Sequence, residues 1–118
     1  MKRGDIYLAD FGKSRDSFSF GKKRPVIIFQ NRKLNLALQE GLYDYALVIP
    51  LSTKEDILTS DFRVKIQKRD RLQKDSYAVV NSISFLHRKF LIEKIAVLEK
   101  EEILEIEKII KEVFELGE

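Results

Sequence analysis

The chain has 118 residues, enough for one domain with a single core but close to the size at which dimerisation often adds buried surface. With no Cys and one His, it excludes disulfides and thiolate chemistry and has too few nitrogen or sulfur ligands for a zinc site. The net charge of +3 is uneven: residues 99–118 carry eight Glu against three Lys, and residues 1–98 carry 19 Lys and Arg against 11 Asp and Glu.

This asymmetry indicates a basic body that faces a polyanion, although the Lys- and Glu-rich surface of a heat-tolerant protein gives a similar composition. The N-terminus lacks the apolar stretch of a signal peptide, and no window approaches the roughly 20 apolar residues that span a bilayer. We therefore expect one cytoplasmic domain over residues 1–118. Carboxylate-bound Mg²⁺ is not excluded by residue counts, but we expect no metal and no other cofactor.

In chain order, residues 5–11 form the first predicted strand, which Gly12 ends. Residues 13–23 are polar and predict a long loop, in which Phe18 and Phe20 stand beside basic residues. Exposed Phe next to Lys and Arg suits stacking on unpaired RNA bases with phosphate contacts alongside. The alternative is that one or both Phe side chains fold back onto the core.

Residues 21–31, G-K-K-R-P-V-I-I-F-Q-N, contain the feature around which the chain is organised. Pro25 has a fixed φ and holds Arg24 in an extended conformation, so the guanidinium is presented from a stiff backbone at the start of a strand. The apolar run after it predicts a strand buried on both faces. A cation held in this way can meet an anion without first being ordered, although Arg24 could equally be one solvated arginine among many.

Next, Asn31 can cap a short helix over residues 32–40, with Gly41 as its stop, although the leucines there also alternate as in a strand. Residues 43–51 predict a buried strand in which Pro50 favours an edge or a strand end. Ser52 and Thr53 follow where this strand leaves the core. Two hydroxyls there could serve a site, or could simply satisfy the backbone of a turn.

Residues 61–67 alternate as a half-exposed strand with a basic outer face, and residues 68–75 predict a charged turn. Residues 76–86 and 90–98 predict two strands of an antiparallel hairpin, with His87 as a surface residue in its turn. Residues 99–116 predict an amphipathic helix whose apolar stripe includes Leu104 and Phe114. This order of elements predicts a strongly curved antiparallel sheet or small barrel with helices packed on it.

Several segments resemble the MazF/PemK toxins, the endoribonucleases of type II toxin-antitoxin systems. They are R-G-D-I-Y-L-A-D at residues 3–10, G-K-K-R-P-V-I-I-F-Q-N at residues 21–31, V-I-P-L-S-T at residues 48–53, Asp75-Ser76 and K-I-A-V-L at residues 94–98. The resemblance implies a mainly β fold with α, an SH3-like barrel of the CcdB/MazF type that dimerises. It also implies a cognate antitoxin with an acidic disordered tail.

The activity that the resemblance implies is cleavage of single-stranded mRNA without a metal, by attack of a ribose 2′-OH that leaves a 2′,3′-cyclic phosphate and a 5′-OH. The catalytic residues it implies are Arg24 and, by spacing, Ser52, with Thr53 as the second possible hydroxyl. The side chains that we expect to contact RNA are Phe18, Phe20, Lys22, Lys23, Gln30, Asn31, Lys54 and Asn81.

The chain departs from the family pattern in three places. It lacks the paired Gly ahead of the Arg-Pro motif, has Ser where relatives have Thr, and reads N-S-I-S-F-L-H-R where relatives tend to carry Gln, Arg and Asp. Two other functions therefore stay open. One is a non-enzymatic CcdB-like inhibitor of DNA gyrase, although those proteins carry a Trp near the C-terminus and this chain has none. The other is a barrel that binds nucleic acid without cutting it.

Overall fold

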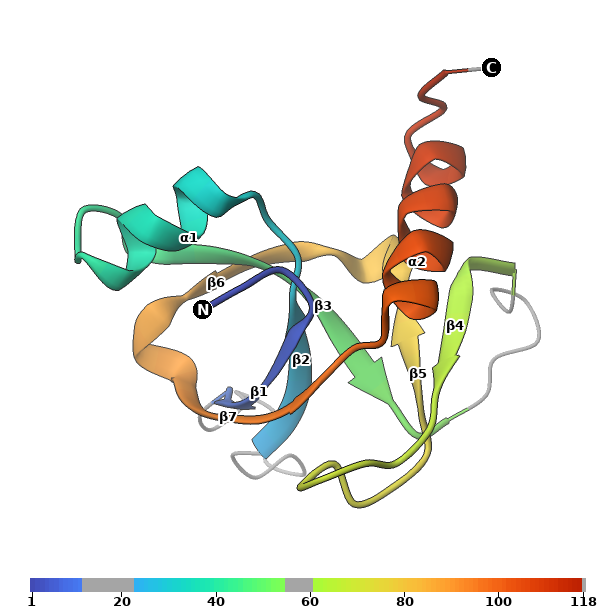
Figure 1. Cartoon of the computed structure of the whole chain (residues 1–118), viewed down its shortest axis with the longest axis horizontal. Helices are drawn as coiled ribbons and strands as arrows, with labels where there is room; N and C mark the ends of the chain where they lie inside the picture. Colours follow the sequence, from blue (N-terminus) through green and yellow to red (C-terminus); the bar gives the residue numbers. More distant parts are fainter. Residues whose placement is uncertain (12–22, 55–60, 118) are drawn as a thin grey trace, which may run out of the picture.

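The structure is a computed structural model that describes residues 1–11, 23–54 and 61–117 (Figure 1). The elements of the described part are, in chain order, β1 (Asp5–Asp10), β2 (Lys23–Ile28), α1 (Arg32–Gln39), β3 (Tyr45–Ser52), β4 (Arg63–Ile66), β5 (Ser76–Val79), the 3₁₀ turn η2 (Val80–Ser82), β6 (Ser84–His87), the 3₁₀ turn η3 (Arg88–Phe90), β7 (Leu91–Val97) and α2 (Lys100–Val113).

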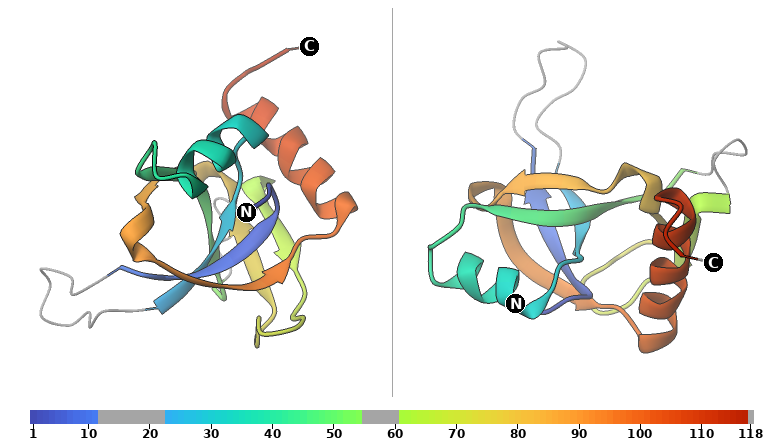
Figure 2. Two further views of the ribbon diagram at one scale, coloured as in Figure 1. Left: turned by 60° about the vertical axis from the view of Figure 1, so that its left-hand side comes forward. Right: turned by 90° about the horizontal axis from the view of Figure 1, so that it is seen from above.

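The strands form one antiparallel sheet in the order β4-β5-β3-β2-β1-β7, with β6 paired to β3 off this path. The sheet curls so that the turn after β4 reaches β7: the N–H of Arg71 donates to the carbonyl of Ile95 at 3.1 Å. No strand ladder joins β4 to β7 in the described part, so the sheet is a curved, open barrel (Figure 2). The predicted fold class is confirmed, with this opening as its refinement.

Pro50 lies in a central strand rather than at an edge. On one side β3 pairs with β2 from Val48 to Pro50, with Val26 opposite Pro50. On its other side β3 pairs with β6 as far as Val48 and with β5 from Leu51 onward. Pro50 therefore falls in the gap between two partners, where a residue without an N–H disrupts a central strand least.

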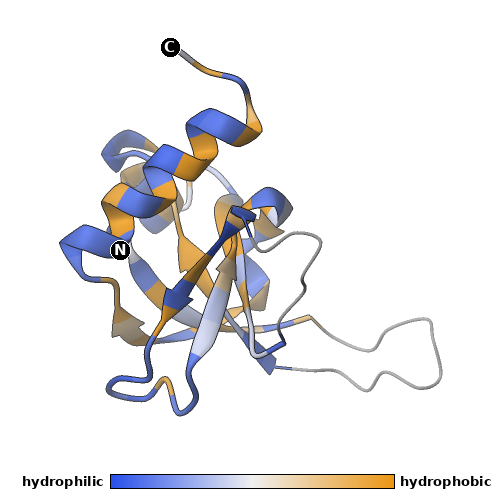
Figure 3. Ribbon diagram, turned by 90° about the vertical axis from the view of Figure 1, so that its right-hand side faces the viewer, coloured by the Kyte–Doolittle hydropathy of each residue, from blue (hydrophilic) through white to orange (hydrophobic). Residues whose placement is uncertain are grey.

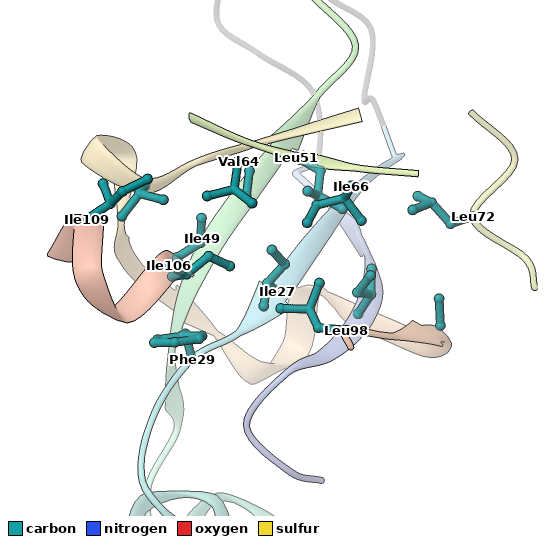
Figure 4. Packing of buried hydrophobic residues seen from close by; sticks show 14 of the residues in the cluster. Ile27, Phe29, Ile49, Leu51, Val64, Ile66, Leu72, Leu98, Ile106 and Ile109 are labelled. Carbon is teal, nitrogen blue, oxygen red and sulfur yellow. The ribbon is translucent and has the colours of Figure 1, made fainter. Parts of the chain in front are cut away.

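The apolar run of β2 is buried on both faces, as predicted. Ile27 belongs to the larger core, which α2 covers with Ile106 and Ile109 (Figure 4). Val26 and Ile28 point to the opposite face and pack in a second cluster with Ala9, Ala46, Val48, Leu86 and Leu38 of α1. Side chains alternate along a strand, so the even-numbered and odd-numbered residues of β2 serve different faces of the sheet.

Both predicted helices are present and lie on different sides of the sheet (Figures 1 and 2). The Asn31 side chain caps α1 by accepting from the N–H of Leu34 at 2.9 Å. Helix α2 presents an apolar stripe toward the sheet (Figure 3), but Leu104 and Phe114 fall outside it and are more than half exposed. None of the helices in the described ranges is long and apolar enough to cross a membrane.

The predicted hairpin of residues 76–86 and 90–98 is wrong. The first segment is broken by η2 into β5 and β6, and β6 pairs with β3, whereas β7 pairs with β1. The polar Asn81 and Ser82 interrupt the strand pattern at this break. Pairing with strands far away in the sequence buries Leu86 and Ile95 in two different clusters, which a local hairpin would not do.

Candidate functional site

The Arg-Pro segment and the two hydroxyls lie at neighbouring strand ends. The ladder of β2 and β3 runs from Ile28 opposite Val48 to Val26 opposite Pro50, where it ends. Arg24 and Ser52 each lie two residues beyond this last pair, at the ends of β2 and β3. Both residues follow the alternation of Val26 and Pro50, so their side chains belong to the same face of the sheet. Arg24 is exposed and Ser52 is partly buried.

From Ser52, a row of residues on this face continues onto β5 and β4. Ser52 stands opposite Tyr77, and Tyr77 stands opposite Lys65. One face of three adjacent strands therefore carries Ser52, Tyr77 and Lys65 in a single line, and Arg24 extends from the end of the next strand, β2, on the same face. A cation and a hydroxyl on one face at the ends of two strands can offer charge and a hydrogen-bond donor to an anion such as a phosphodiester.

The Ser52 hydroxyl is oriented by the turn that follows β3. Its Oγ accepts from the backbone N–H of Lys54 at 3.2 Å. The Lys54 carbonyl in turn accepts from Nη1 of Arg63 at 2.6 Å, so β4, which β5 separates from β3 in the sheet, also holds this turn. The Nε atom of Arg63 is buried and has no partner among the described residues.

A cleft of about 440 Å³ opens on the other face of the same strand ends. Its lining consists of Leu8, Lys23, Pro25, Leu51, Thr53, Arg71, Leu72, Gln73, Lys74, Ser76, Glu93 and Ile95. The cleft lies at the open mouth of the barrel, between the ends of β2 and β3, strand β7 and the turn before β5. Lys23 and Thr53 are the immediate chain neighbours of Arg24 and Ser52 but point to this opposite face.

The structure thus separates the two candidate hydroxyls. Ser52 shares the face of Arg24, and Thr53 lines the cleft together with Lys23. Lys54 is exposed in the turn that follows them and stabilises this turn through its backbone N–H and carbonyl. The remaining predicted contacts Phe18, Phe20 and Lys22 lie outside the described residues.

Gln30 does not fit its predicted role. It is buried, its Nε2 donates to Oδ1 of Asn35 at 2.9 Å, and its Oε1 accepts from the N–H of Leu47 at 2.9 Å. These bonds tie the end of β2 to α1 and β3, which is a structural role. Asn31 is exposed but holds the N-terminus of α1, and it is seven residues, roughly 20 Å of extended chain, from Arg24.

Gln30 and Asn31 instead line a separate hollow of about 800 Å³ at the far end of the sheet. Asn81 is exposed in η2, which follows β5 and is not part of the row that contains Tyr77. The structure therefore places Arg24 and Ser52 on one face at the ends of β2 and β3, Lys23 and Thr53 in the cleft on the other face, and Gln30 and Asn31 at a separate hollow.

Sequence reasoning missed Arg63 and the cleft residues Arg71, Gln73 and Lys74. The alternation of residues 61–67 placed Arg63 on a basic outer face, but a contact with Lys54 depends on the pairing of β4 with β5, which no local pattern indicates. Residues 68–75 were visible only as a charged turn. Within the described ranges, no three acidic or His side chains group closely enough to hold a metal ion.

Comparison with known proteins agrees with this fold. Residues 2–114 match the family model described as "PemK-like, MazF-like toxin of type II toxin-antitoxin system", and the chain belongs to this toxin family. It is 32% identical over 112 residues to a protein called Endoribonuclease MazF from Staphylococcus epidermidis, covering 91% of this chain and 85% of the relative.

Two solved structures illustrate the likeness in fold. The first is the Mycobacterium tuberculosis toxin MazF-mt6, with a TM-score of 0.74 and 18% identity, covering 97% of this chain and 99% of the other. The second is an endoribonuclease in complex with its cognate antitoxin from a mycobacterial species, with a TM-score of 0.76 and 18% identity, covering 100% and 98%. At such low identity these structures establish the shared fold alone.

Proposed function

We propose that this toxin is a sequence-selective endoribonuclease that cuts single-stranded mRNA without a metal. The observation that carries the proposal is the position of Arg24 and Ser52 on one face at the ends of two paired strands, each two residues beyond Val26 opposite Pro50. The 32% identity to a protein named as an endoribonuclease supports the same activity. The substrate brings its own nucleophile, the ribose 2′-OH, so the protein need supply neither Cys nor a catalytic His.

In the proposed reaction, the 2′ oxygen forms a bond to phosphorus and the bond to the 5′ oxygen breaks. The products are a 2′,3′-cyclic phosphate and a 5′-OH, and the proton lost by the 2′-OH is balanced by one gained by the leaving oxygen. Charge develops on the non-bridging oxygens, where the always-charged guanidinium of Arg24 stabilises it. The Arg-Pro backbone holds this cation in place before substrate arrives.

Ser52 is the preferred hydroxyl over Thr53. The Lys54 N–H occupies one lone pair of the Ser52 Oγ, so the O–H of Ser52 is left to donate to a phosphate oxygen. Thr53 belongs to the face of the cleft and would meet a different part of the RNA.

The proposed partners are RNA, a second copy of the chain and a cognate antitoxin, all in the cytoplasm. Two of the structures with this fold are described as complexes, one with a cognate antitoxin and one as MazE-MazF from Deinococcus radiodurans. An acidic disordered tail would offer carboxylates to Arg24 in place of RNA phosphates. Purified antitoxin should then compete with RNA for the toxin; tight simultaneous binding of both would contradict this.

The central test is incubation with a defined single-stranded RNA in EDTA, followed by analysis of the fragment ends. We expect 2′,3′-cyclic phosphate and 5′-OH ends, and a roughly 100- to 1,000-fold slower reaction for Arg24→Ala, as for loss of one preorganised stabilising group. The matched control is Arg32→Ala, because Arg32 is also an exposed arginine but lies in α1. Unchanged cleavage by Arg24→Ala would refute the site.

Two other outcomes separate the alternatives. Inhibition of DNA gyrase supercoiling with no RNA product would favour a CcdB-like toxin. Binding of RNA with a steep salt dependence and no cleavage would favour a nucleic-acid-binding barrel.

A further inference from the structure

The cleft beside Thr53 has the composition of a nucleobase pocket. Five apolar residues form part of its lining: Leu8, Pro25, Leu51, Leu72 and Ile95. The uncharged polar groups are Thr53, Gln73 and Ser76. Binding sites for small ligands commonly combine apolar walls with a few placed donors and acceptors, and an unstacked RNA base is held in this way.

The charges around the cleft suit RNA. Lys23, Arg71 and Lys74 contribute three cations, and Glu93 is the one acidic residue in the described lining. Glu93 is paired with Arg71 at 3.2 Å, which leaves the remaining lysines to set a positive rim. Phosphates on either side of an inserted base would meet this rim while the base meets the apolar wall.

Size and position connect the cleft to the cleavage site. A volume of about 440 Å³ accommodates a single nucleotide and excludes a duplex. Lys23 and Thr53 each lie one residue from the proposed catalytic pair, a Cα separation of about 3.8 Å. Both strands end here, so an RNA that crosses the rim can place a phosphate on the face of Arg24 and the adjoining base on the other face.

We propose that this cleft binds one unstacked base next to the scissile phosphate and sets the base preference of the toxin. The proposal rests on the function proposed above and extends it to the recognition of a flanking nucleotide. Gln73 is the main specificity-determining residue, since its exposed amide can both donate to and accept from the edge of a base. The Ser76 O–H already donates to the Lys74 carbonyl at 3.0 Å, so Ser76 offers only lone pairs.

The first experiment sequences the products from a randomised RNA library cut by wild type, Gln73→Ala and Thr53→Val. We expect the preference at one position beside the cut to weaken by roughly 3- to 10-fold, the value of one neutral hydrogen bond, because the preferred RNA loses that bond and other sequences do not. Gln67→Ala, an exposed amide outside the lining, should leave the profile unchanged. Identical profiles for wild type, Gln73→Ala and Thr53→Val would overturn the assignment.

A second readout does not depend on cleavage. An oligonucleotide with 2′-deoxyribose at the cut and 4-thiouracil beside it is bound, irradiated and mapped by mass spectrometry. Crosslinks to residues 71–76 support the proposal, and crosslinks confined to other segments oppose it. Displacement of the oligonucleotide from this cleft by an acidic peptide, with no effect of base identity, would also oppose it and would identify a peptide site.

The two proposals fail in different ways. If Arg24→Ala cuts RNA at the wild-type rate, the proposed catalytic site fails, while the crosslinks still report on the cleft. If Arg24→Ala is inactive and the profiles and crosslinks do not involve the cleft, only the base pocket fails.

Discussion

Arg63 of β4 donates from Nη1 to the backbone carbonyl of Lys54 at 2.6 Å. The N–H of the same residue, Lys54, donates to the Ser52 Oγ at 3.2 Å. A side chain on one strand therefore fixes the turn that orients a hydroxyl at the end of another. Because the Arg63 guanidinium acts on Ser52 through the backbone, we regard Arg63 as a positioning residue.

Arg63→Met should slow RNA cleavage by about 10- to 100-fold, because small displacements of a reacting group cost this much. Arg63→Lys keeps a cation and a donor and should recover part of the rate. The diagnostic measurement is the single-turnover rate in a Ser52→Ala background, where Arg63→Met should have no additional effect. An equal loss in both backgrounds would show that Arg63 does not act through Ser52.

Ser52→Ala should lower kcat by roughly 100-fold, as for removal of one donor to a developing oxyanion. Ser52→Thr keeps the hydroxyl and should retain most of the rate. Thr53→Val is nearly isosteric and should leave kcat for the preferred sequence close to wild type, since Thr53 lines the cleft on the opposite face. Single-turnover kinetics on one defined RNA distinguish these variants, and a larger loss for Thr53→Val than for Ser52→Ala would exchange their roles.

Gly4→Ala should destabilise the fold by about 1–3 kcal/mol. Gly4 has φ +98°, and a Cβ there would lie 2.9 Å from Cδ1 of Ile103 in α2. Gly117→Ala is the matched control, because Gly117 has φ +80° but no atom within 4 Å of the added Cβ. Urea unfolding at one protein concentration measures both variants. A loss no larger for Gly4→Ala than for Gly117→Ala would show that Ile103 moves aside at little cost.

Burial raises the pKa of the Tyr7 phenol above its ordinary value of 10.0, and the Asp5 carboxylate adds to the rise while Lys94 opposes it. The folded state thus holds the phenol proton more tightly than the unfolded state. Its contribution to stability is complete below about pH 10 and is lost as the pH rises through the folded pKa.

Phe has no ionisable proton, so the free energy of unfolding of Tyr7→Phe should fall less than that of wild type as the pH rises above about 10. Unfolding midpoints in urea between roughly pH 8 and pH 11 test this, with Tyr43→Phe, an exposed tyrosine, as control. Parallel curves for wild type and Tyr7→Phe would contradict the expectation.

The elements that the sequence predicted well are those specified by nearby residues. Asn31 and Gly41 bracket α1, the apolar run after Pro25 makes a buried strand, and residues 61–67 alternate as β4 does. The hairpin at His87 was mispredicted because strand partners are chosen by distant contacts. The pairing of β6 with β3 buries Leu86, and this gain is invisible in the local pattern.

The candidate site was accessible to sequence reasoning only as separate motifs. Arg24-Pro25 and Ser52-Thr53 were visible as a held cation and two hydroxyls, but their faces depend on the register of β2 and β3. The prediction that Gln30 contacts RNA assumed that a polar residue after a strand reaches solvent. In the structure its side-chain amide instead accepts from the N–H of Leu47 and donates to Asn35. Arg63 could be recognised only once β4 was placed beside β3's final turn.

Because side chains alternate at the ends of β2 and β3, neighbouring residues there face opposite sides of the sheet, and the two faces can be changed independently. Under the two proposals above, exchanges at Lys23 or Thr53 would change the base preference and leave the proposed chemistry at Arg24 and Ser52 intact. A shift of β2 by one residue would instead turn the Arg24 guanidinium toward the cleft. The proposed cleavage would then be lost although no amino acid of the site had changed.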